Sequence, residues 1–168
     1  MVIDLRSASG PADASPPGVR HPTEADSEAL AVLMLNAYRG TIDADGSETI
    51  DDARTEVRGY FAANSGAPLL EHSYVVSEGG RLVSAVLASR LEGKPLLAYA
   101  MTAPSHKGRG LASALTHRAL DSLRAAGDAQ MHLWVTAGNA DAEHIYERIG
   151  FRDVDSTPVG REIPPHAR

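Results

Sequence analysis

The sequence predicts one mixed α/β domain. Segments in which apolar residues recur at helical spacing come first, and after Pro68 the pattern changes to short apolar runs separated by turns. The expected order is helix, helix, three strands, helix, strand, helix and a last strand, which is typical of a mixed sheet flanked by helices. The length of 168 residues suits a single domain around one core.

The N-terminal part of the chain is expected to hold a flexible segment and then two helices. Residues 1–18 are expected to be a flexible leader, because most of them are glycine, proline, alanine or serine. The folded domain is expected to occupy residues 19–168. Its helices are expected to begin at Thr23–Asp26 and at Thr49–Asp52, where a hydroxyl is followed three residues later by an acid, as in a capping box.

The middle of the chain is expected to supply the strands. Ser73–Ser77 and Arg81–Leu87 flank a Glu78–Gly80 turn and predict a β-hairpin. Leu96–Met101 is apolar throughout, which predicts a central strand. The remaining expected elements are a helix from Leu111, a strand over Gln130–Val135, a helix between Asn139 and Gly150 with Ala142, Ile145, Tyr146 and Ile149 on one face, and a strand from Phe151.

Composition excludes several classes of function. The chain has no cysteine, so disulfides, thiol nucleophiles, iron–sulfur clusters and thiolate zinc sites are excluded, and a reducing, cytoplasmic setting is expected. The histidines show no closely spaced pair, so no metal is expected. The net charge of −6 argues against nucleic acid as a partner. No apolar run reaches the roughly 18 residues of a membrane helix, so no membrane partner is expected.

The charge is unevenly distributed along the chain. Residues 24–56 hold nine acids against two arginines, whereas residues 105–124 hold four basic residues against one aspartate. Within the basic segment, Ser105–Gly110 is a glycine-bearing loop between an expected strand and an expected helix. Such a loop is suited to an anion, because glycines allow close approach to the unpaired N–H groups at a helix start. An ordinary strand-to-helix turn remains the alternative, and neither a P-loop nor a Rossmann fingerprint matches.

The glycine loop resembles a known motif. Thr102–Ala112 is similar to the acetyl-CoA motif of the GNAT N-acetyltransferase superfamily, Gln/Arg-x-x-Gly-x-Gly/Ala, with Gly110 and Ala112 at the matching positions. Lys107 replaces the usual Gln or Arg, which keeps a charge and loses the planar fork. Asn139–Phe151 resembles the family's second signature. A weaker third resemblance lies at residues 19–26, so the likeness runs over about residues 19 to 155.

The resemblance implies a three-layer fold with a central, splayed mixed β-sheet flanked by helices and acetyl-CoA in its opening. It implies that backbone groups at Met101 and Thr102 pair with the pantetheine arm and that Asn139 lies near that arm. Tyr146 matches the tyrosine that protonates the departing thiolate in many relatives, although a core aromatic is the alternative. The resemblance also implies that the pyrophosphate is held by N–H groups of Lys107, Gly108, Arg109, Gly110, Leu111 and Ala112.

The expected function is therefore acetyl transfer from acetyl-CoA to a primary amine. Without cysteine there is no cysteinyl acyl-enzyme, so direct attack in a ternary complex is expected. The acceptor is expected to be a small-molecule or peptide amine of unknown identity, and the acidic segment could attract its charge, although solvated helix faces are the simpler interpretation. The base candidates are Glu71, His72, Glu92 and His132, each more often structural.

Three alternatives concern activity and assembly. A non-catalytic module that binds and senses acyl-CoA would keep the same fold and motifs. A small interaction protein would use the glycine loop only as a turn. A homodimer is possible, since many members of the resembled family pair through late strands.

Overall fold

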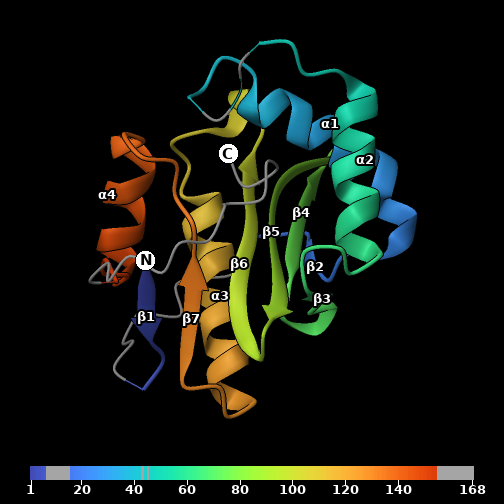
Figure 1. Cartoon of the computed structure of the whole chain (residues 1–168). Coiled ribbons are helices and arrows are strands. Elements are labelled where there is room, and N and C mark those ends of the chain that lie inside the picture. Colours follow the sequence, from blue (N-terminus) through green and yellow to red (C-terminus); the bar gives the residue numbers. More distant parts are fainter. Residues whose placement is uncertain (7–15, 43, 45, 155–168) are drawn as a thin grey trace.

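The structure is a computed structural model that describes residues 1–6, 16–42, 44 and 46–154. Its centre is a seven-stranded sheet in the order β1-β7-β6-β5-β4-β2, with β3 paired to β5 (Figure 1). All pairings are antiparallel except that of β6 with β7, so the sheet is mixed as predicted. The strands are β1 (Val2–Asp4), β2 (Val19–Arg20), β3 (Ala67–Pro68), β4 (Tyr74–Glu78), β5 (Arg81–Leu91), β6 (Lys94–Thr102) and β7 (Gln130–Leu133).

Helices cover both faces of the sheet and complete three layers. The helices are α1 (Ser27–Tyr38), α2 (Ile50–Phe61), α3 (Leu111–Ala125) and α4 (Ala140–Ile149), with short 3-10 turns at Glu24–Asp26, Leu70–His72 and Pro104–His106. Alternate residues of β5 face opposite sides: Ala85 and Leu87 pack with α1 and α2, whereas Val86 and Ala88 pack with α3. This period of two divides the buried side chains into two clusters, one on each face.

Both predicted capping boxes are present. Thr23 N–H donates to Asp26 at 2.8 Å, and one turn of 3-10 helix follows before α1 begins. Thr49 N–H donates to Asp52 at 2.8 Å, and Asp52 N–H donates to Thr49 Oγ1 at 3.3 Å. These bonds satisfy N–H groups that a helix start leaves unpaired. The starts of the two helices are therefore confirmed within one turn.

The predicted hairpin and central strand are also confirmed. β4 and β5 pair around Gly79 and Gly80, and β6 lies between β5 and β7. The pairing of β5 with β6 is interrupted at one point, because Leu87 faces Tyr99 whereas Ala88 faces Leu97. Ala98 is therefore an additional residue on β6, and such a bulge bends a strand and redirects its side chains.

Both ends of the chain differ from the sequence expectations. The expectation of a flexible leader is wrong for the first residues, because Val2–Asp4 forms β1 and pairs with β7, with Ile3 and Leu5 buried. Three residues are too few to show a period, so the strand was missed. The part of the leader at residues 7–15 lies outside the described residues. The expected last strand is reduced, within residues 1–6, 16–42, 44 and 46–154, to one bridge between Val2 and Arg152.

Helix α4 is less buried than its apolar stripe predicted. Ile145 is 45% exposed, and none of the residues of α4 is fully buried. Tyr146 and Ile149 pack against the cluster under α3. Asn139 caps the helix by accepting from Ala142 N–H at 3.2 Å, and Gly150 ends it with φ of 116°. The helix limits were thus predicted correctly, whereas the burial of its apolar face was not.

Candidate active site

The site lies where β6 and β7 separate. The two strands pair at Leu96–His132 and Leu97–Leu133, and the ladder ends there. β6 continues to Thr102, whereas the chain after β7 leads through Trp134 toward α4. The edge of β6 that faced β7 is consequently released beyond Leu97, which gives the sheet the expected splay. The bulge at Ala98 lies at the same level of the strand.

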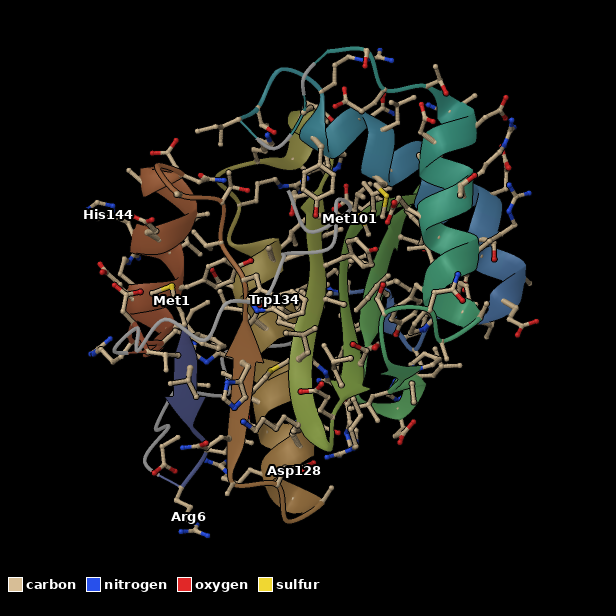
Figure 2. All side chains as sticks on the ribbon, in the orientation of Figure 1. Met1, Arg6, Met101, Asp128, Trp134 and His144 are labelled. Carbon is tan, nitrogen blue, oxygen red and sulfur yellow. The ribbon has the colours of Figure 1, made fainter. Side chains whose placement is uncertain are left out.

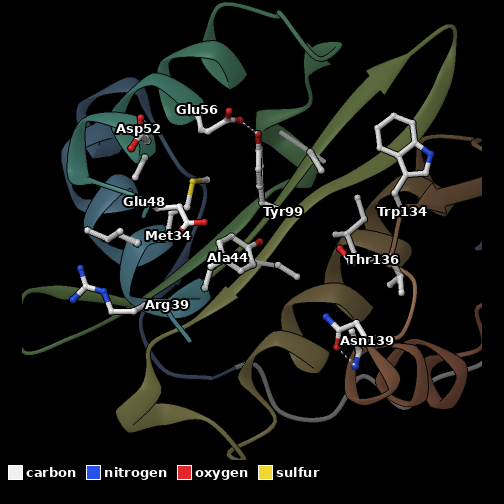
Figure 3. Close-up of a pocket in the computed structure, with 18 of the residues that line it drawn as sticks. Met34, Arg39, Ala44, Glu48, Asp52, Glu56, Tyr99, Trp134, Thr136 and Asn139 are labelled. Atoms are coloured by element: carbon white, nitrogen blue, oxygen red, sulfur yellow. Dashed lines mark hydrogen bonds between the residues drawn. The ribbon is translucent and has the colours of Figure 1, made fainter. Parts of the chain in front are cut away.

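A cavity of about 350 Å³ lies in this opening (Figure 3). Its lining comes from three parts of the chain. One wall is formed by α1, α2 and the segment between them, the floor by Leu97–Ala100 of β6, and the opposite wall by Trp134–Thr136 and the start of α4. Residues far apart in the sequence therefore meet at the point where the central sheet opens.

Three carboxylates of the acidic segment line this cavity: Glu48, Asp52 and Glu56. Glu48 accepts from Gly46 N–H at 3.0 Å, and Asp52 belongs to the capping box of α2. Glu56 is half-buried and accepts from the Tyr99 hydroxyl at 3.1 Å, as the dashed line in Figure 3 marks. The acidic segment is thus a wall of the cavity in addition to forming solvated helix faces.

Tyr99 is fixed by its surroundings. Its ring lies edge-on to that of Tyr60 at 6.2 Å, and Tyr60 donates to Ala88 O at 2.8 Å in the core. Burial, and then the neighbouring charge of Glu56, raises the pKa of Tyr99 well above its usual range. Burial likewise raises the pKa of Tyr60 to about 12. Both hydroxyls therefore remain protonated near neutral pH, so Tyr99 is the donor in its bond to Glu56.

Tyr146 and Asn139 lie on the other wall of the cavity. Tyr146 is half-buried, and its ring packs edge-on against that of Phe151 at 5.7 Å. The ring packs against the core, as the core-aromatic interpretation expects, and the residue also lines the cavity. Trp134, 47% exposed, lies beside β7 at the edge of the same cavity (Figure 2).

The predicted anion loop enters α3 through two left-handed glycines. Gly108 has φ of 77° and Gly110, the N-cap of α3, has φ of 73°. A side chain at either position would be strained, so glycine is required by the backbone conformation itself. Ala114 N–H donates to Gly110 O at 2.9 Å, so the N–H groups of Leu111 and Ala112 precede the first intrahelical bond. This arrangement fits a phosphate group at the helix start.

The two cations of the loop have protein partners in this structure. Lys107 Nζ donates to Ala37 O near the end of α1 at 3.4 Å. Arg109 Nη1 lies 3.4 Å from Glu78 Oε2, and His106 Nε2 lies 3.0 Å from the same oxygen. The hydrogen bond from His106 is the main reason that the pKa of Glu78 is lowered. Lys107 thus ties the loop to α1, and an anion would compete with Glu78 for Arg109.

The side chains of Met101 and Thr102 already have partners within the protein, so a ligand beside β6 would meet their backbone groups. The Met101 side chain is buried beside α1 (Figure 2), and its carbonyl accepts from Ser84 Oγ at 3.0 Å. Thr102 Oγ1 lies 3.0 Å from Ser84 Oγ. The released edge of β6 leads from the cavity floor past Met101 to the glycine loop, which connects the two parts of the site along one strand.

None of the four base candidates from the sequence lines the cavity. Glu71 is solvent-exposed, and His72 Nδ1 lies 2.6 Å from Ser122 Oγ under α3. Glu92 is in the turn between β5 and β6, and His132 faces β1 within the sheet. Burial lowers the pKa of His132. Sequence reasoning missed instead the pair of Glu56 and Tyr99, whose only sequence signal was the general acidity of residues 24–56.

The splayed mixed sheet, the glycine loop after its central strand and the cavity in the opening together form the arrangement that the sequence resemblance implies. Comparison with known families makes this resemblance specific. A model of the acetyltransferase (GNAT) family matches residues 35–151, and the chain belongs to this family.

Individual relatives and solved structures are similar to parts or most of the chain. The mycothiol acetyltransferase of Beutenbergia cavernae is 51% identical over 51 residues, which is 30% of this chain and 17% of that protein, so the chain matches about a sixth of its length. The ribosomal-protein-S18-alanine N-acetyltransferase of Escherichia coli has a TM-score of 0.62 and 21% identity, covering 81% of this chain and 77% of that one. A GNAT acetyltransferase from Brucella melitensis, solved with acetyl-CoA, has a TM-score of 0.62 and 22% identity, covering 87% and 90%.

No group of three or more histidine, aspartate or glutamate side chains among the residues that the structure describes is placed to hold a metal ion. No helix in the described part of the chain is long and apolar enough to cross a membrane.

Proposed function

We propose that this protein transfers the acetyl group of acetyl-CoA to a primary amine by direct attack. The observation that carries the proposal is the continuous path along β6, from the glycine loop to the cavity. A coenzyme extended along the released edge of β6 would have its pyrophosphate at one end and its thioester at the other. The acceptor would then approach the thioester through the cavity.

The glycine loop and β6 form the proposed coenzyme site. The N–H groups of residues 107–112 would hold the pyrophosphate at the start of α3, where the helix dipole adds partial positive charge. Backbone groups at Met101 and Thr102 would pair with the pantetheine arm as an added strand does. The structure supports this with left-handed Gly108 and Gly110, whose missing side chains leave the loop backbone accessible.

Tyr146 is the proposed acid for the leaving group. When the C–S bond of the thioester breaks, the CoA thiolate leaves more readily if it receives a proton. Tyr146 lines the cavity, and its ring is held against Phe151, so the hydroxyl has a defined position. Asn139 caps α4 and so fixes the helix that carries this tyrosine.

Direct attack agrees with the composition of the chain. A cysteinyl acetyl-enzyme is excluded, because the sequence has no cysteine. A cavity beside the released edge of β6 would let acceptor and coenzyme occupy one opening, so both would be bound when the transfer occurs. The acceptor is a small-molecule or peptide amine.

The test is the release of CoA thiol from acetyl-CoA with spermidine, tobramycin and a lysine-bearing peptide as acceptors. We expect amine-dependent thiol release with at least one acceptor class and formation of the matching amide by mass spectrometry. Calorimetry with acetyl-CoA is run in parallel. Binding without thiol release for any amine would favour the non-catalytic sensing module, and absence of binding would overturn both functions.

A further inference from the structure

The proposed transfer requires an acceptor nitrogen with a free lone pair. A primary amine has a pKa near that of lysine, about 10.4, so at neutral pH it is an ammonium ion. A base must remove one proton before the nitrogen attacks the thioester carbon. Because the base candidates suggested by the sequence lie outside the cavity, the carboxylates of its wall are the groups to compare.

The three carboxylates differ in what they already bind. Asp52 Oδ2 accepts from both Thr49 N–H and Thr49 Oγ1, and so fixes the start of α2. Glu48 is exposed and accepts from Gly46 N–H in a turn. Glu56 is half-buried, and its partner among the described residues is the Tyr99 hydroxyl, bound through Oε2. Its other oxygen, Oε1, has no hydrogen-bond partner within residues 1–6, 16–42, 44 and 46–154.

Tyr99 gives Glu56 a fixed position close to the opening of the sheet. Tyr99 follows the bulged residue Ala98 on the floor of the cavity. Its hydroxyl bonds to Glu56 of α2, and this bond connects α2 to the strand proposed to hold the coenzyme. Figure 3 shows the Tyr99 side chain extending from β6 to Glu56 across the cavity wall. The ring of Tyr60 packs edge-on against it. One oxygen of Glu56 is therefore held, and the other is left for an acceptor.

We propose that Glu56 binds the ammonium group of the acceptor and takes its proton, and that Tyr99 is the positioning residue for this carboxylate. The inference rests on the proposed function. Among the described residues, the other charged groups that line the cavity are Asp52 of α2, Glu48 before it and Arg39 after α1. The two carboxylates favour a cationic acceptor as well, whereas Arg39 opposes it.

The proposed steps balance in atoms and charge. One N–H bond of the ammonium breaks, and the proton moves to Glu56 Oε1. The nitrogen lone pair forms the N–C bond, and collapse of the tetrahedral intermediate breaks the C–S bond. The thiolate takes the Tyr146 proton, the second proton on nitrogen restores that hydroxyl, and Glu56 returns its proton to solvent. Ammonium and acetyl-CoA thus give an amide, the CoA thiol and one proton.

The test compares Glu56→Gln with the wild type, using whichever of spermidine, tobramycin or the lysine-bearing peptide the wild type acetylates. Glutamine keeps the size of the side chain and an acceptor for Tyr99 but takes no proton. We expect kcat/KM near neutral pH to fall about 100-fold, within the usual range for loss of a general base. The difference in kcat/KM between Glu56→Gln and the wild type should shrink as pH rises toward the pKa of the amine, because the amine then enters the site from solution already neutral. The Kd for acetyl-CoA should be unchanged.

Glu71→Gln is the matched control. Glu71 is an exposed glutamate outside the cavity, so its substitution should leave the rate and the pH profile unchanged. Wild-type rate and profile in Glu56→Gln would overturn the role of Glu56 and leave the proposed function intact. Acetyl-CoA binding without turnover of any amine by the wild type would instead overturn the proposed function, and the role of Glu56 with it.

Tyr99→Phe separates a positioning role from a structural one. The Tyr99 hydroxyl holds Oε2 of Glu56, so Tyr99→Phe removes the bond that fixes the carboxylate. We expect kcat to fall about tenfold or less. Because Tyr99 acts through Glu56, adding Tyr99→Phe to Glu56→Gln should lower kcat no further, and a double-mutant cycle measures this coupling. A purely structural tyrosine would lower kcat by the same factor in both backgrounds, and that result would overturn its positioning role.

Discussion

The two halves of the opening between β6 and β7 are built from different kinds of group. The half proposed for the coenzyme is built from backbone: the released edge of β6 and the N–H groups around Gly108 and Gly110. The half proposed for the acceptor is built from side chains, among them Glu56, Tyr99 and Trp134, which come from separate segments. A backbone site demands glycine at fixed spacing, whereas a side-chain site can be assembled in many ways. The same fold can therefore keep one coenzyme and change its acceptor.

The largest expected effect lies where the two halves meet. Tyr146→Phe removes only the hydroxyl and keeps the ring against Phe151. We expect kcat to fall about 100-fold, because loss of a positioned acid typically has an effect of this size, while the Kd for acetyl-CoA stays constant. Steady-state thiol release and calorimetry measure the two quantities. Tyr74→Phe, in the core on the α3 face, is the control. Full turnover of Tyr146→Phe would exclude the acid role.

A substitution in the glycine loop should act mainly on the binding of the coenzyme. Gly110→Ala places a side chain at φ of 73°, which costs about 1 kcal/mol or more and shifts the N–H groups of the helix start. We expect the Kd for acetyl-CoA to rise about tenfold, a difference of about 1.4 kcal/mol. Gly93→Ala carries the same strain, with φ of 80° and open space around it, at the turn between β5 and β6. Equal effects of the two variants on Kd would mean that the loop is only a turn.

A smaller effect is expected from the carboxylate that occupies Arg109. Glu78→Gln removes the charge that pairs with Arg109 and His106. Acetyl-CoA should then bind about threefold more tightly at low salt, since exposed ion pairs contribute about 1 kcal/mol or less. Raising the salt concentration should remove the difference. Weaker binding by this variant, measured by calorimetry, would show that Glu78 organises the loop instead of competing with the coenzyme.

The smallest expected effect concerns the stability of the protein and comes from an ion pair at the start of α1, one of the helices that line the cavity. The hydrogen bond from Arg20 lowers the pKa of Asp26 to about 2. Because the folded-state pKa is depressed, the stabilisation is present above about pH 4 and is lost as pH falls toward 2. Solvent screening of the half-exposed Arg20 limits it to about 1 kcal/mol. Asp26→Asn should therefore lower stability at neutral pH and flatten its fall in acid, measured by urea unfolding. An unchanged acid dependence would contradict this assignment.

Much of the fold was predictable because its signals are local. The capping boxes at Thr23 and Thr49, the turn at Gly79 and Gly80 and the apolar run of β6 each specify structure within a few residues. Strand β1 was not predictable in this way, since three residues near the N-terminus show no pattern until they pair with β7. The exposure of Ile145 was also missed, because helical spacing shows a shared face and not what covers it.

The candidate site also contains parts with a local sequence signal and parts that depend on contacts between distant segments. The glycine loop, Asn139 and Tyr146 were predicted from the sequence, because a motif fixes their spacing. Glu56 and Tyr99 are 43 positions apart, and only the packing of α2 against β6 brings their oxygens to 3.1 Å. The partners of Lys107 and Arg109 were unexpected for the same reason, because Ala37 and Glu78 lie on distant elements.

The central claim is that acetyl-CoA lies along β6 with its thioester between Tyr99 on the cavity floor and Tyr146 on the wall beside α4. A crystal structure of the protein with CoA tests it most directly. The account predicts the pyrophosphate against the N–H groups of residues 107–112, the pantetheine arm beside Met101 and Thr102, and the sulfur facing the cavity. A coenzyme bound away from the β6–β7 opening, or with its sulfur directed away from the cavity, would contradict the account.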